Sequence, residues 1–455
     1  MLPTLSSAAD TIVAPATPPG RSAIALVRIS GASAREVAAR VAPDLPSPVP
    51  ERSPLLALIR DADGAEIDRA VVTLFASPRS ATGEDVVEIS LHGGPAVVAR
   101  TLSAIAAAGA RPARPGEFTE RAFLHGKLDL MEAEAVRDLI EARTPEAARA
   151  SARRLAGSLS RRLAGIREDL VHAAALLAAT IDFAEDVGEQ VPEEAPRRIA
   201  AAAAELARLE ETAERGRLLT EGARVVLLGK PNAGKSTLFN ALAGSDRAIV
   251  TEYPGTTRDT LDAVIDVEGA PVEIVDTAGL RDSPEPVERI GVARAREAGA
   301  AADAVLYVFD AGAGWSPEDA AAVAALACPR VLLVANKIDT APTPGTAANA
   351  PPGLPICGIA PEAAETLRNA LAALLGAGPP PDALSDVLGS LRQRDLVVRA
   401  RAAADAAREA LARGESPEYP AARVDESLAA LADLFGETTP EEVLERIFRT
   451  FCIGK

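Results

Sequence analysis

A phosphate-binding loop stands near the middle of the chain. The apolar run Val225 to Leu228 is typical of a strand buried on both faces, and Gly229-Lys-Pro-Asn-Ala-Gly-Lys-Ser236 follows it directly. This octapeptide fits G-x-x-x-x-G-K-S/T at every fixed position, and the helix-forming residues after it complete the strand, loop and helix that the motif requires. Lys235 would place a cation near the β- and γ-phosphates of a nucleotide, and the Ser236 hydroxyl can ligate Mg2+. A chance glycine-rich turn is the alternative, and the fitting flanks argue against it.

Later motifs indicate which nucleotide is expected. Gly255-Thr-Thr-Arg-Asp259 can add a threonine hydroxyl to the Mg2+ shell once a γ-phosphate is bound. Asp276 and Gly279 form a D-x-x-G motif, whose carboxylate would hold Mg2+ through water and whose glycine N–H would meet the γ-phosphate. In the N-K-x-D motif, Asp339 can accept hydrogen bonds from N1–H and the exocyclic amine of guanine, and Asn336 can bond the base edge. Adenine lacks that pair of donors, so the motif selects GTP over ATP.

The usual water-positioning group is missing from this set. Leu280 stands where many small GTPases have a glutamine, and no arginine finger within the chain is evident. The amide oxygen of Asn232 can help to bind a monovalent cation where such a finger would lie. Glu288 is close enough in sequence to orient the attacking water, and a solvated loop carboxylate is its equal alternative on chemistry alone.

Length and composition limit the class of protein. The chain has 455 residues, 48% hydrophobic and 25% charged, which suffices for two or three domains with cores of their own. Its formal net charge of −17 argues against a broad electrostatic grip on nucleic acid, so any such contact must be local. The three scattered cysteines predict a reducing compartment and no disulfide framework. Since the sequence shows no signal peptide and no apolar run of membrane-spanning length, we expect a cytoplasmic protein without a membrane span.

The pattern of apolar residues divides the chain into segments. Residues 1–119 mix strand and helix signals and predict an α+β domain, and residues 120–220 are typical of helices. Strands and helices alternate over residues 221–375, which predicts a mostly parallel sheet with helices on both faces. Helical patterns return over residues 376–455. We therefore expect the nucleotide-binding domain to be inserted into one helical domain.

Two long helical stretches are expected in the first helical segment, over residues 145–184 and 196–217. The earlier stretch carries a basic cluster, for which a solvated helix face is the main interpretation and tRNA contact the alternative. This cluster comprises Arg149, Arg153, Arg154, Arg161, Arg162 and Arg167. The isolated histidines His92 and His125 are expected to cap turns or to line a pocket.

Nearly from end to end, the chain resembles the MnmE (TrmE) family of tRNA uridine-modification GTPases. The strings that carry the resemblance, the last of them highly specific to the family, are Asp10–Arg21, Thr82–Asp85, His92–Pro95, Ala113–Arg121, Lys127–Leu130, Gly255–Asp259 and Phe451–Lys455. The resemblance implies a multidomain fold: an N-terminal α+β folate-binding-like domain, an all-α helical domain and an inserted Ras-like α/β P-loop GTPase domain. It also implies a homodimer formed through the N-terminal domain, whose two G domains pair when K+ and GTP are bound.

The resemblance further implies a K+-dependent GTPase that acts in tRNA modification. With an FAD- and NADH-using partner, the MnmG (GidA) protein, the family installs an aminomethyl-type or carboxymethylaminomethyl group at C5 of the wobble uridine, position 34 of certain tRNAs. A heterotetramer with that partner is therefore expected. The one-carbon donor is a tetrahydrofolate derivative, 5-formyl- or 5,10-methylene-tetrahydrofolate. The alternative function is a regulatory GTPase switch in ribosome or RNA maturation.

Site residues follow from matching the family's motifs position by position. The resemblance assigns Mg2+ to Ser236 and Thr257, and it makes Glu288 the water-orienting residue beside Asn232 and Lys235 in the catalytic set. The implied K+ ligands are Asn232, Thr251, Thr256 and the backbone oxygen of Tyr253. The implied folate contacts, which sequence alone would take for surface charge, are Arg28, Glu88, Lys127 and Lys455. The expected GTP contacts are Asn232, Ala233, Gly234, Lys235, Ser236, Thr237, Thr251, Glu252, Tyr253, Pro254, Gly255, Thr256, Thr257, Asp276, Thr277, Ala278, Gly279, Asn336, Lys337, Ile338, Asp339, Cys357, Gly358 and Ile359.

One stretch departs from the family pattern. Cys357-Gly358-Ile359 stands where the family's base-contact loop usually has Ser-Ala-Lys or Ser-Ala-Arg. Because a backbone N–H can still meet guanine O6 there, we expect GTP specificity to persist, in a looser form. Cys452 matches a family cysteine, for which a buried or merely proximal thiol is as good an interpretation as a catalytic one.

Overall fold

A computed structural model of the protein describes residues 10–182, 191–244, 248–249, 261–276, 302–340, 352–377 and 387–455. The chain forms two compact units, and each is treated by itself. Unit 1 comprises Met1–Arg137, Leu170–Ala195 and Glu409–Lys455, and unit 2 comprises Asp138–Asp169 and Pro196–Arg408. Both ends of the chain therefore contribute to unit 1.

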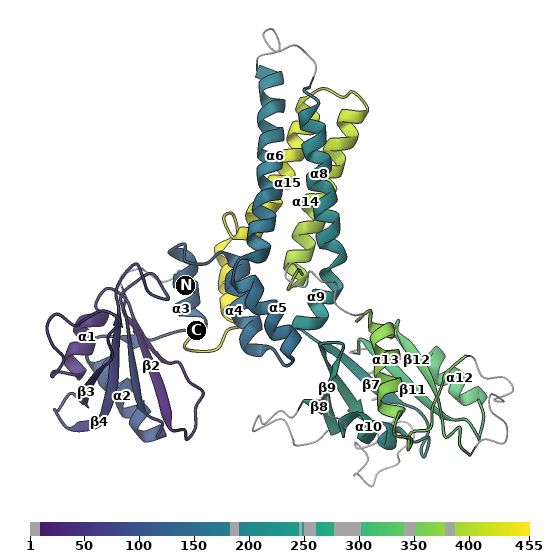
Figure 1. The fold of residues 1–455 in the computed structure, drawn as a ribbon, viewed down its shortest axis with the longest axis horizontal. Coiled ribbons are helices and arrows are strands. Elements are labelled where there is room, and N and C mark those ends of the chain that lie inside the picture. The colour runs from purple at the N-terminus through teal and green to yellow at the C-terminus, as the bar shows by residue number, and fades with distance from the viewer. Residues whose placement is uncertain are drawn as a thin grey trace. The chain divides into compact units, whose positions relative to one another are not determined.

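Unit 1 contains a six-stranded sheet in the order β3-β4-β5-β2-β1-β6, in which neighbours are antiparallel except for β1 and β6. Its strands are β1 (Ile12–Pro15), β2 (Ile24–Ser30), β3 (Leu55–Arg60), β4 (Glu66–Phe75), β5 (Val86–His92) and β6 (Arg111–Pro112). Helices α1 (Ala34–Val41) and α2 (Pro95–Ala107) pack on one face of this sheet (Figure 1). Side chains alternate between the faces of a strand, so Val87 and Ile89 of β5 enter this core and Glu88 lies on the other face.

The C-terminal segment packs against α3 (Glu117–Leu124) and α4 (Leu130–Glu141) of unit 1. Helices α15 (Glu418–Phe435) and α16 (Glu441–Phe448) also contribute to the unit. Leu130 of α4, Phe448 of α16 and Phe451 are buried in one apolar cluster. Beyond this cluster, the backbone N–H of Phe118 in α3 donates to the carbonyl oxygen of Lys455 at 3.3 Å.

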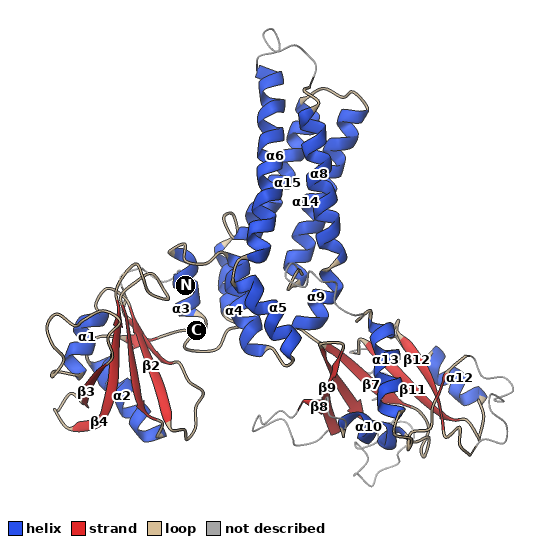
Figure 2. Ribbon diagram, viewed as in Figure 1, coloured by secondary structure: helices blue, strands red, loops and turns tan. Residues whose placement is uncertain are grey.

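Unit 2 contains a seven-stranded sheet in the order β13-β12-β11-β7-β10-β9-β8. Its strands are β7 (Ala223–Leu228), β8 (Ala248–Ile249), β9 (Leu261–Val267), β10 (Ala270–Asp276), β11 (Ala304–Asp310), β12 (Val331–Asn336) and β13 (Leu354–Pro355). Strands from β13 to β10 are parallel to their neighbours, and β9 and β8 pair antiparallel. Helices α10 (Lys235–Ala243) and α13 (Ala363–Leu375) pack on one face, and α12 (Pro317–Ala324) packs on the other (Figure 2).

The remaining helices of unit 2 are held together by buried apolar side chains, among them Leu163, Leu206 and Val397, and by ion pairs. They are α5 (Pro145–Leu155), α6 (Ser158–Asp182), α8 (Glu194–Glu211), α9 (Ala213–Thr220) and α14 (Leu391–Ala412), of which α6, α8 and α14 also contribute to unit 1. Arg162 of α6 pairs with Glu205 of α8 at 2.9 Å, and Arg401 of α14 pairs with Glu210 of α8 at 2.7 Å. Among the described helices, none combines the length and apolarity needed to cross a bilayer.

The predicted multidomain fold class is confirmed, and two predicted helices are divided. The stretch expected to be helical over residues 145–184 breaks between α5 and α6, where Gly157 adopts a left-handed φ of 76°. The stretch expected over residues 196–217 ends its first helix at Glu211, and a new helix begins at Ala213. Periodicity extends across both breaks, so it could not reveal them.

Candidate functional site

The predicted phosphate and base motifs meet at one edge of the unit 2 sheet. Strands β10 and β11 both pair with β7 in parallel, and β12 pairs with β11 in parallel. Their carboxyl ends carry the glycine loop after β7, Asp276 of β10, Asp310 of β11 and Asn336 of β12. Ligands of open α/β sheets bind at this edge, because the loops and helix N-termini converge there.

The glycine loop is shaped by residues with left-handed backbone angles. Gly229 has a φ of 140°, and a Cβ atom there would lie 2.0 Å from the carbonyl oxygen of Val308, so only glycine fits. Asn232 has a φ of 62°, a conformation that asparagine adopts more readily than most residues. The buried Lys235 donates from Nζ to the carbonyl oxygens of Gly229 and Lys230, at 2.9 and 2.8 Å. Its ammonium group is thus held over the loop, at the N-terminus of α10.

Two predicted magnesium-site residues lie together. Ser236 Oγ donates to Asp276 Oδ2 at 2.9 Å, and Asp276 is fully buried at the end of β10. A hydroxyl and a carboxylate that converge in this way supply the hard oxygen ligands that Mg2+ prefers. The chemistry of these two residues therefore fits the ion directly or through its water shell.

Asn336 connects the phosphate loop to the loop that departs from the family pattern. Its side chain is 2% exposed, and Nδ2 donates to the carbonyl oxygen of Ala233 at 2.9 Å. The N–H of Gly358 donates to Asn336 Oδ1 at 2.9 Å. A Cβ atom at Gly234 would lie only 2.1 Å from Asn336 Nδ2. One buried carboxamide thus fixes the separation of the two loops.

Lys337 makes a second connection between the strand ends. Its Nζ donates to the carbonyl oxygen of Asn232 at 2.7 Å and to Asp310 Oδ2 at 2.9 Å. Burial alone would raise the pKa of Asp310, but the hydrogen bonds from Lys337 and from the Gly312 and Ala313 N–H groups outweigh it and lower the pKa. Asp310 was not among the predicted site residues, although it ends a strand as Asp276 does.

The other predicted nucleotide contacts have differing environments. Thr237, Asn232, Ile338, Asp339 and Ile359 are exposed, and Cys357 is half-buried. The predicted residues that lie outside the described part of the chain are Thr251, Glu252, Tyr253, Pro254, Gly255, Thr256, Thr257, Thr277, Ala278, Gly279 and Glu288, and the same holds for Leu280.

A pocket of about 440 Å³ lies in unit 1, and its walls include Glu88 and Lys127, two of the residues that the resemblance assigns to folate. Arg52, Phe75 and Arg79 also line it, and sequence reasoning had missed them. Phe75 and Val86 are register partners on β4 and β5 and lie at the pocket together. The volume lies within the range of small-molecule sites.

Arg28 and Lys455 have different relations to this pocket. Arg28 faces Glu88 across β2 and β5 and donates to its Oε1 from Nε at 3.0 Å and from Nη2 at 2.8 Å. The Arg28 guanidinium lies 5.8 Å from the centroid of the Phe118 ring. The Phe118 N–H donates to the Lys455 carbonyl oxygen, so Arg28 and Lys455 both contact Phe118 of α3.

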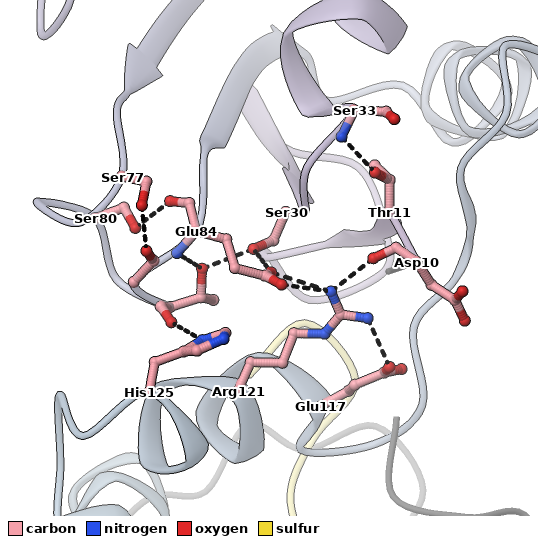
Figure 3. Close-up of polar contacts among 12 residues, drawn as sticks. Asp10, Thr11, Ser30, Ser33, Ser77, Ser80, Glu84, Glu117, Arg121 and His125 are labelled. Atoms are coloured by element: carbon pink, nitrogen blue, oxygen red, sulfur yellow. Dashed lines mark hydrogen bonds and ion pairs between the residues drawn. The ribbon is translucent and has the colours of Figure 1, made fainter. Parts of the chain in front are cut away.

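A buried ionic network supports these elements from within unit 1 (Figure 3). Arg121 is 1% exposed and donates from Nη1 to Glu84 at 3.0 Å and to the carbonyl oxygen of Asp10 at 2.7 Å. Its Nη2 donates to the fully buried Glu117 at 3.2 Å. Burial disfavours the charged form of Glu117, but hydrogen bonds from Arg111 and the Arg114 N–H outweigh this and lower its pKa to about 2.

The network brings three of the strings that carry the family resemblance into contact with one another. Asp10, Glu84 and Arg121 belong to three different strings and meet through Arg121. His125 Nδ1 lies 2.8 Å from the carbonyl oxygen of Thr82, which agrees with the predicted turn-capping role. The charges in these strings were the only available signal, and sequence gave no indication that they pair with one another.

Three arginines of the basic cluster expected on the early helices are paired with carboxylates. Arg154 is buried and pairs with Asp138 at 3.0 Å, and Arg162 is paired with Glu205. Arg149 is exposed and pairs with Glu146 at 3.3 Å. These pairs agree with a structural role for those three arginines, whereas Arg153 and Arg161 are exposed.

Known proteins resemble this chain over nearly its whole length. The family description "MnmE helical domain" matches residues 130–452, and "GTP-binding protein TrmE N-terminus" matches residues 11–127. A protein of Koribacter versatilis described as tRNA modification GTPase MnmE is 42% identical over 451 residues, 98% of this chain and 99% of that relative. A relative with the same description from Thermus thermophilus is 42% identical over 449 residues, again 98% of this chain and 99% of the relative.

Solved structures match part of the chain. Aquifex aeolicus Era bound to GDP and AlF4− is 25% identical, with a TM-score of 0.25, over 40% of this chain and 66% of that chain. The G domain of the T. maritima FeoB iron transporter is 23% identical, with a TM-score of 0.24, over 33% of this chain and 98% of that chain.

Proposed function

The chain belongs to the MnmE family of tRNA modification GTPases, and from this premise we propose that it is a K+-dependent GTPase that modifies the wobble uridine of certain tRNAs. With an FAD-dependent partner of the MnmG (GidA) kind, it adds a carboxymethylaminomethyl or aminomethyl group to C5 of uridine 34. The one-carbon unit comes from a tetrahydrofolate derivative. The observation that carries the proposal is the meeting of Lys235, the Ser236–Asp276 pair and Asn336 at one sheet edge.

This chain's own residues bind and orient GTP at that edge. Lys235 leaves the carbonyls of its loop and pairs with the β- and γ-phosphates, and the N-terminus of α10 favours the same negative charge. Ser236 and Asp276 hold Mg2+, which when bound offsets charge on the phosphate oxygens. Asp339 reads the guanine edge, and Asn336 and Lys337 keep the loops at the separation that the nucleotide needs.

A potassium ion and Glu288 complete the proposed hydrolytic machinery. The Asn232 side chain is exposed on the phosphate loop, and its amide oxygen is suited to a monovalent cation together with Thr251, Thr256 and the backbone oxygen of Tyr253. The bound ion supplies positive charge where other GTPases use an arginine finger. Glu288 orients the attacking water in place of the absent glutamine.

The first unit supports the proposed folate site and homodimer. Glu88 and Lys127 line one pocket, and Arg28 is bonded to Glu88. On the sheet face away from α1 and α2, Ile24, Leu56 and Val71 are 62%, 64% and 39% exposed. Exposed apolar side chains on a sheet face are suited to a second copy of the chain.

The proposal assigns the segments and the assembly as follows. Residues 1–119 form the folate-binding and dimerisation domain, residues 120–220 and 376–455 the helical domain, and residues 221–375 the inserted G domain. The homodimer joins two MnmG subunits in a heterotetramer that acts on tRNA in the cytoplasm.

Two measurements test the proposal. Mass spectrometry of position 34 in total tRNA should show the modification in cells with the wild-type gene, and no modification in cells with the Ser236→Ala variant. The Thr340→Ala variant, which loses an exposed hydroxyl at the same sheet edge, should behave as wild type. Replacing K+ by Na+ should slow GTP hydrolysis by roughly tenfold or more, because the ion fills a finger's role. Equal rates in the two salts would contradict the potassium site. If cells with the wild-type gene carry no modification at position 34, or if cells with Ser236→Ala carry as much of it, the regulatory switch is favoured instead.

A further inference from the structure

Cationic side chains gather at the unit 1 pocket, where two arginines join Lys127, which the proposed function already uses. Arg52, Arg79 and Lys127 line this pocket together with the apolar side chains of Phe75 and Val86. The side chains of Arg52 and Arg79 are 55% and 72% exposed, so their guanidinium groups can reach a ligand. Such a local excess of positive charge stands out in a chain with a net charge of −17.

Arg52 is held in its place at a conformational cost. Its φ is 55°, in the left-handed region that most residues other than glycine and asparagine avoid. The backbone is fixed there because the Arg52 N–H donates to the carbonyl oxygen of Leu74 at 2.7 Å. The guanidinium lies 5.8 Å from the centroid of the Phe75 ring. A strained position that presents an arginine to a pocket suggests that the side chain itself is needed.

A carboxylate of the protein already bridges the two arginines. Glu51 Oε2 accepts from Arg79 Nη2 at 2.8 Å, and Glu51 Oε1 lies 3.4 Å from Arg52 Nε. Arg52 Nη2 also donates to the carbonyl oxygen of Arg79, which ties the two loops together. Two guanidiniums share one carboxylate, so a net positive charge remains for a second anion. Glu51 thereby shows which kind of group this part of the pocket accepts.

We propose that Arg52, Arg79 and Lys127 form a subsite for the carboxylates of a folate's γ-linked glutamate tail, so that the site prefers polyglutamylated folates. This inference rests on the proposed folate function and specifies its substrate. Each γ-linked glutamate adds one α-carboxylate to the tail, and guanidiniums bind carboxylates with directed pairs of hydrogen bonds. The Phe75 ring, which lines the pocket beside Arg52, is suited to an edge or stacking contact with the planar benzoyl ring that precedes the tail.

The arrangement makes predictions of opposite sign for neighbouring residues. Arg52→Asn and Arg79→Gln remove a cation each and should weaken binding of the triglutamate, by about fivefold each. Asparagine tolerates the left-handed φ, so Arg52→Asn keeps the local backbone. Glu51→Gln removes the competing carboxylate and should tighten binding. A merely structural role for this cluster would make all three variants weaken binding alike.

The experiment is calorimetric titration of the full-length protein with 5-formyltetrahydrofolate, its tri-γ-glutamate form and a tetrahydropterin that lacks the tail. The matched control is Arg100→Gln, because Arg100 is also exposed and paired with a carboxylate, Asp61, at 2.8 Å, but belongs to α2 on the other sheet face. Unfolding midpoints of all variants show whether the fold is retained. We expect wild type to bind the triglutamate more tightly than the monoglutamate, with a difference that shrinks at high salt.

The outcomes separate this inference from the folate function itself. If the wild-type protein binds both folates equally, or if Arg52→Asn and Arg79→Gln weaken the tail-less pterin as much as the triglutamate, the subsite is refuted while the folate site stands. If the two variants lower affinity for tRNA and leave folate binding unchanged, the cations serve phosphates and the inference is also refuted. If no folate binds at all, both proposals fall.

Discussion

Replacing Asn336 by alanine should detach the phosphate loop from the base-contact loop. The change removes the donor to the Ala233 carbonyl and the acceptor of the Gly358 N–H, each 2.9 Å from the carboxamide. Both partners are buried, so each is left without a hydrogen bond at a cost of about 1–3 kcal/mol. Taking the low end for both gives about 2 kcal/mol, which corresponds to a roughly 30-fold rise in the Kd for GTP if the loops must be rejoined on binding.

Two readouts are needed, because Asn336 can also touch the base. Fluorescence titration with a labelled GTP gives the affinity, and urea unfolding without nucleotide gives the stability of the apo site. The chain's single tryptophan, Trp315, packs against Tyr307 and Phe309 in the same unit and reports its unfolding. We expect Asn336→Ala to lower both affinity and apo stability. Asn336→Asp should not restore either, because a carboxylate oxygen would face the Ala233 carbonyl.

A matched control variant and a result that would refute the positioning role of Asn336 can both be named. Thr340→Ala removes an exposed hydroxyl four residues later and should change neither readout. If Asn336→Ala weakens GTP binding but leaves apo unfolding unchanged, the residue acts on the base alone and the positioning argument is wrong.

Two further predictions concern unit 1. Glu117, whose pKa is lowered from 4.5 to about 2, contributes stability that is present above pH 4.5 and is lost as pH falls toward 2. The contribution is about 3 kcal/mol, so Glu117→Gln should flatten the acid limb of a circular-dichroism unfolding series, whereas Glu36→Gln, an exposed carboxylate on α1, should not. Gly454→Ala should weaken folate binding by displacing Lys455, the neighbouring residue that the proposal assigns to folate. The displacement is expected because Gly454 has a φ of 94° and its Cβ would lie 2.1 Å from the Pro15 carbonyl oxygen. Titration with 5-formyltetrahydrofolate measures this, and an affinity equal to wild type would show that the terminal residues do not help to form the site.

The parts of the molecule that sequence predicted well depend on contiguous residues. The strand, glycine loop and helix around Lys235 follow from one short motif, because each residue's role is set by its immediate neighbours. The helix Pro95–Ala107 likewise begins at a proline, because proline favours the first turn of a helix. Local sequence therefore sufficed for the fold class and for the strand, loop and helix of the phosphate-binding motif.

The parts that sequence missed depend on pairings between distant strands. Glu88 and Lys127 became neighbours of Arg52 and Arg79 only because β4 and β5 bring their loops to one pocket. The bond from Asn336 to Ala233 spans 103 residues, and no spacing rule predicts it. The arginines of α5 and α6 formed a cationic stripe in sequence, but the carboxylate partners of Arg154 and Arg162 come from other helices. The sequence shows which charged residues the chain contains. The tertiary pairing of helices and strands decides which of those charges are neutralised by a partner and which remain available to a ligand.

The five terminal residues illustrate why a family string can be specific without being catalytic. Phe451 fills an apolar cluster with Leu130 and Phe448, and the Cys452 carbonyl oxygen accepts from the Gly116 N–H at 3.4 Å. A Cβ atom at Gly116 would lie 2.3 Å from the Phe448 carbonyl oxygen, so only glycine fits at position 116 beside this segment. The packing constraint therefore applies to Phe451 and Gly454, whereas the exposed side chains of Cys452 and Ile453 and the half-buried Lys455 remain available for a chemical role.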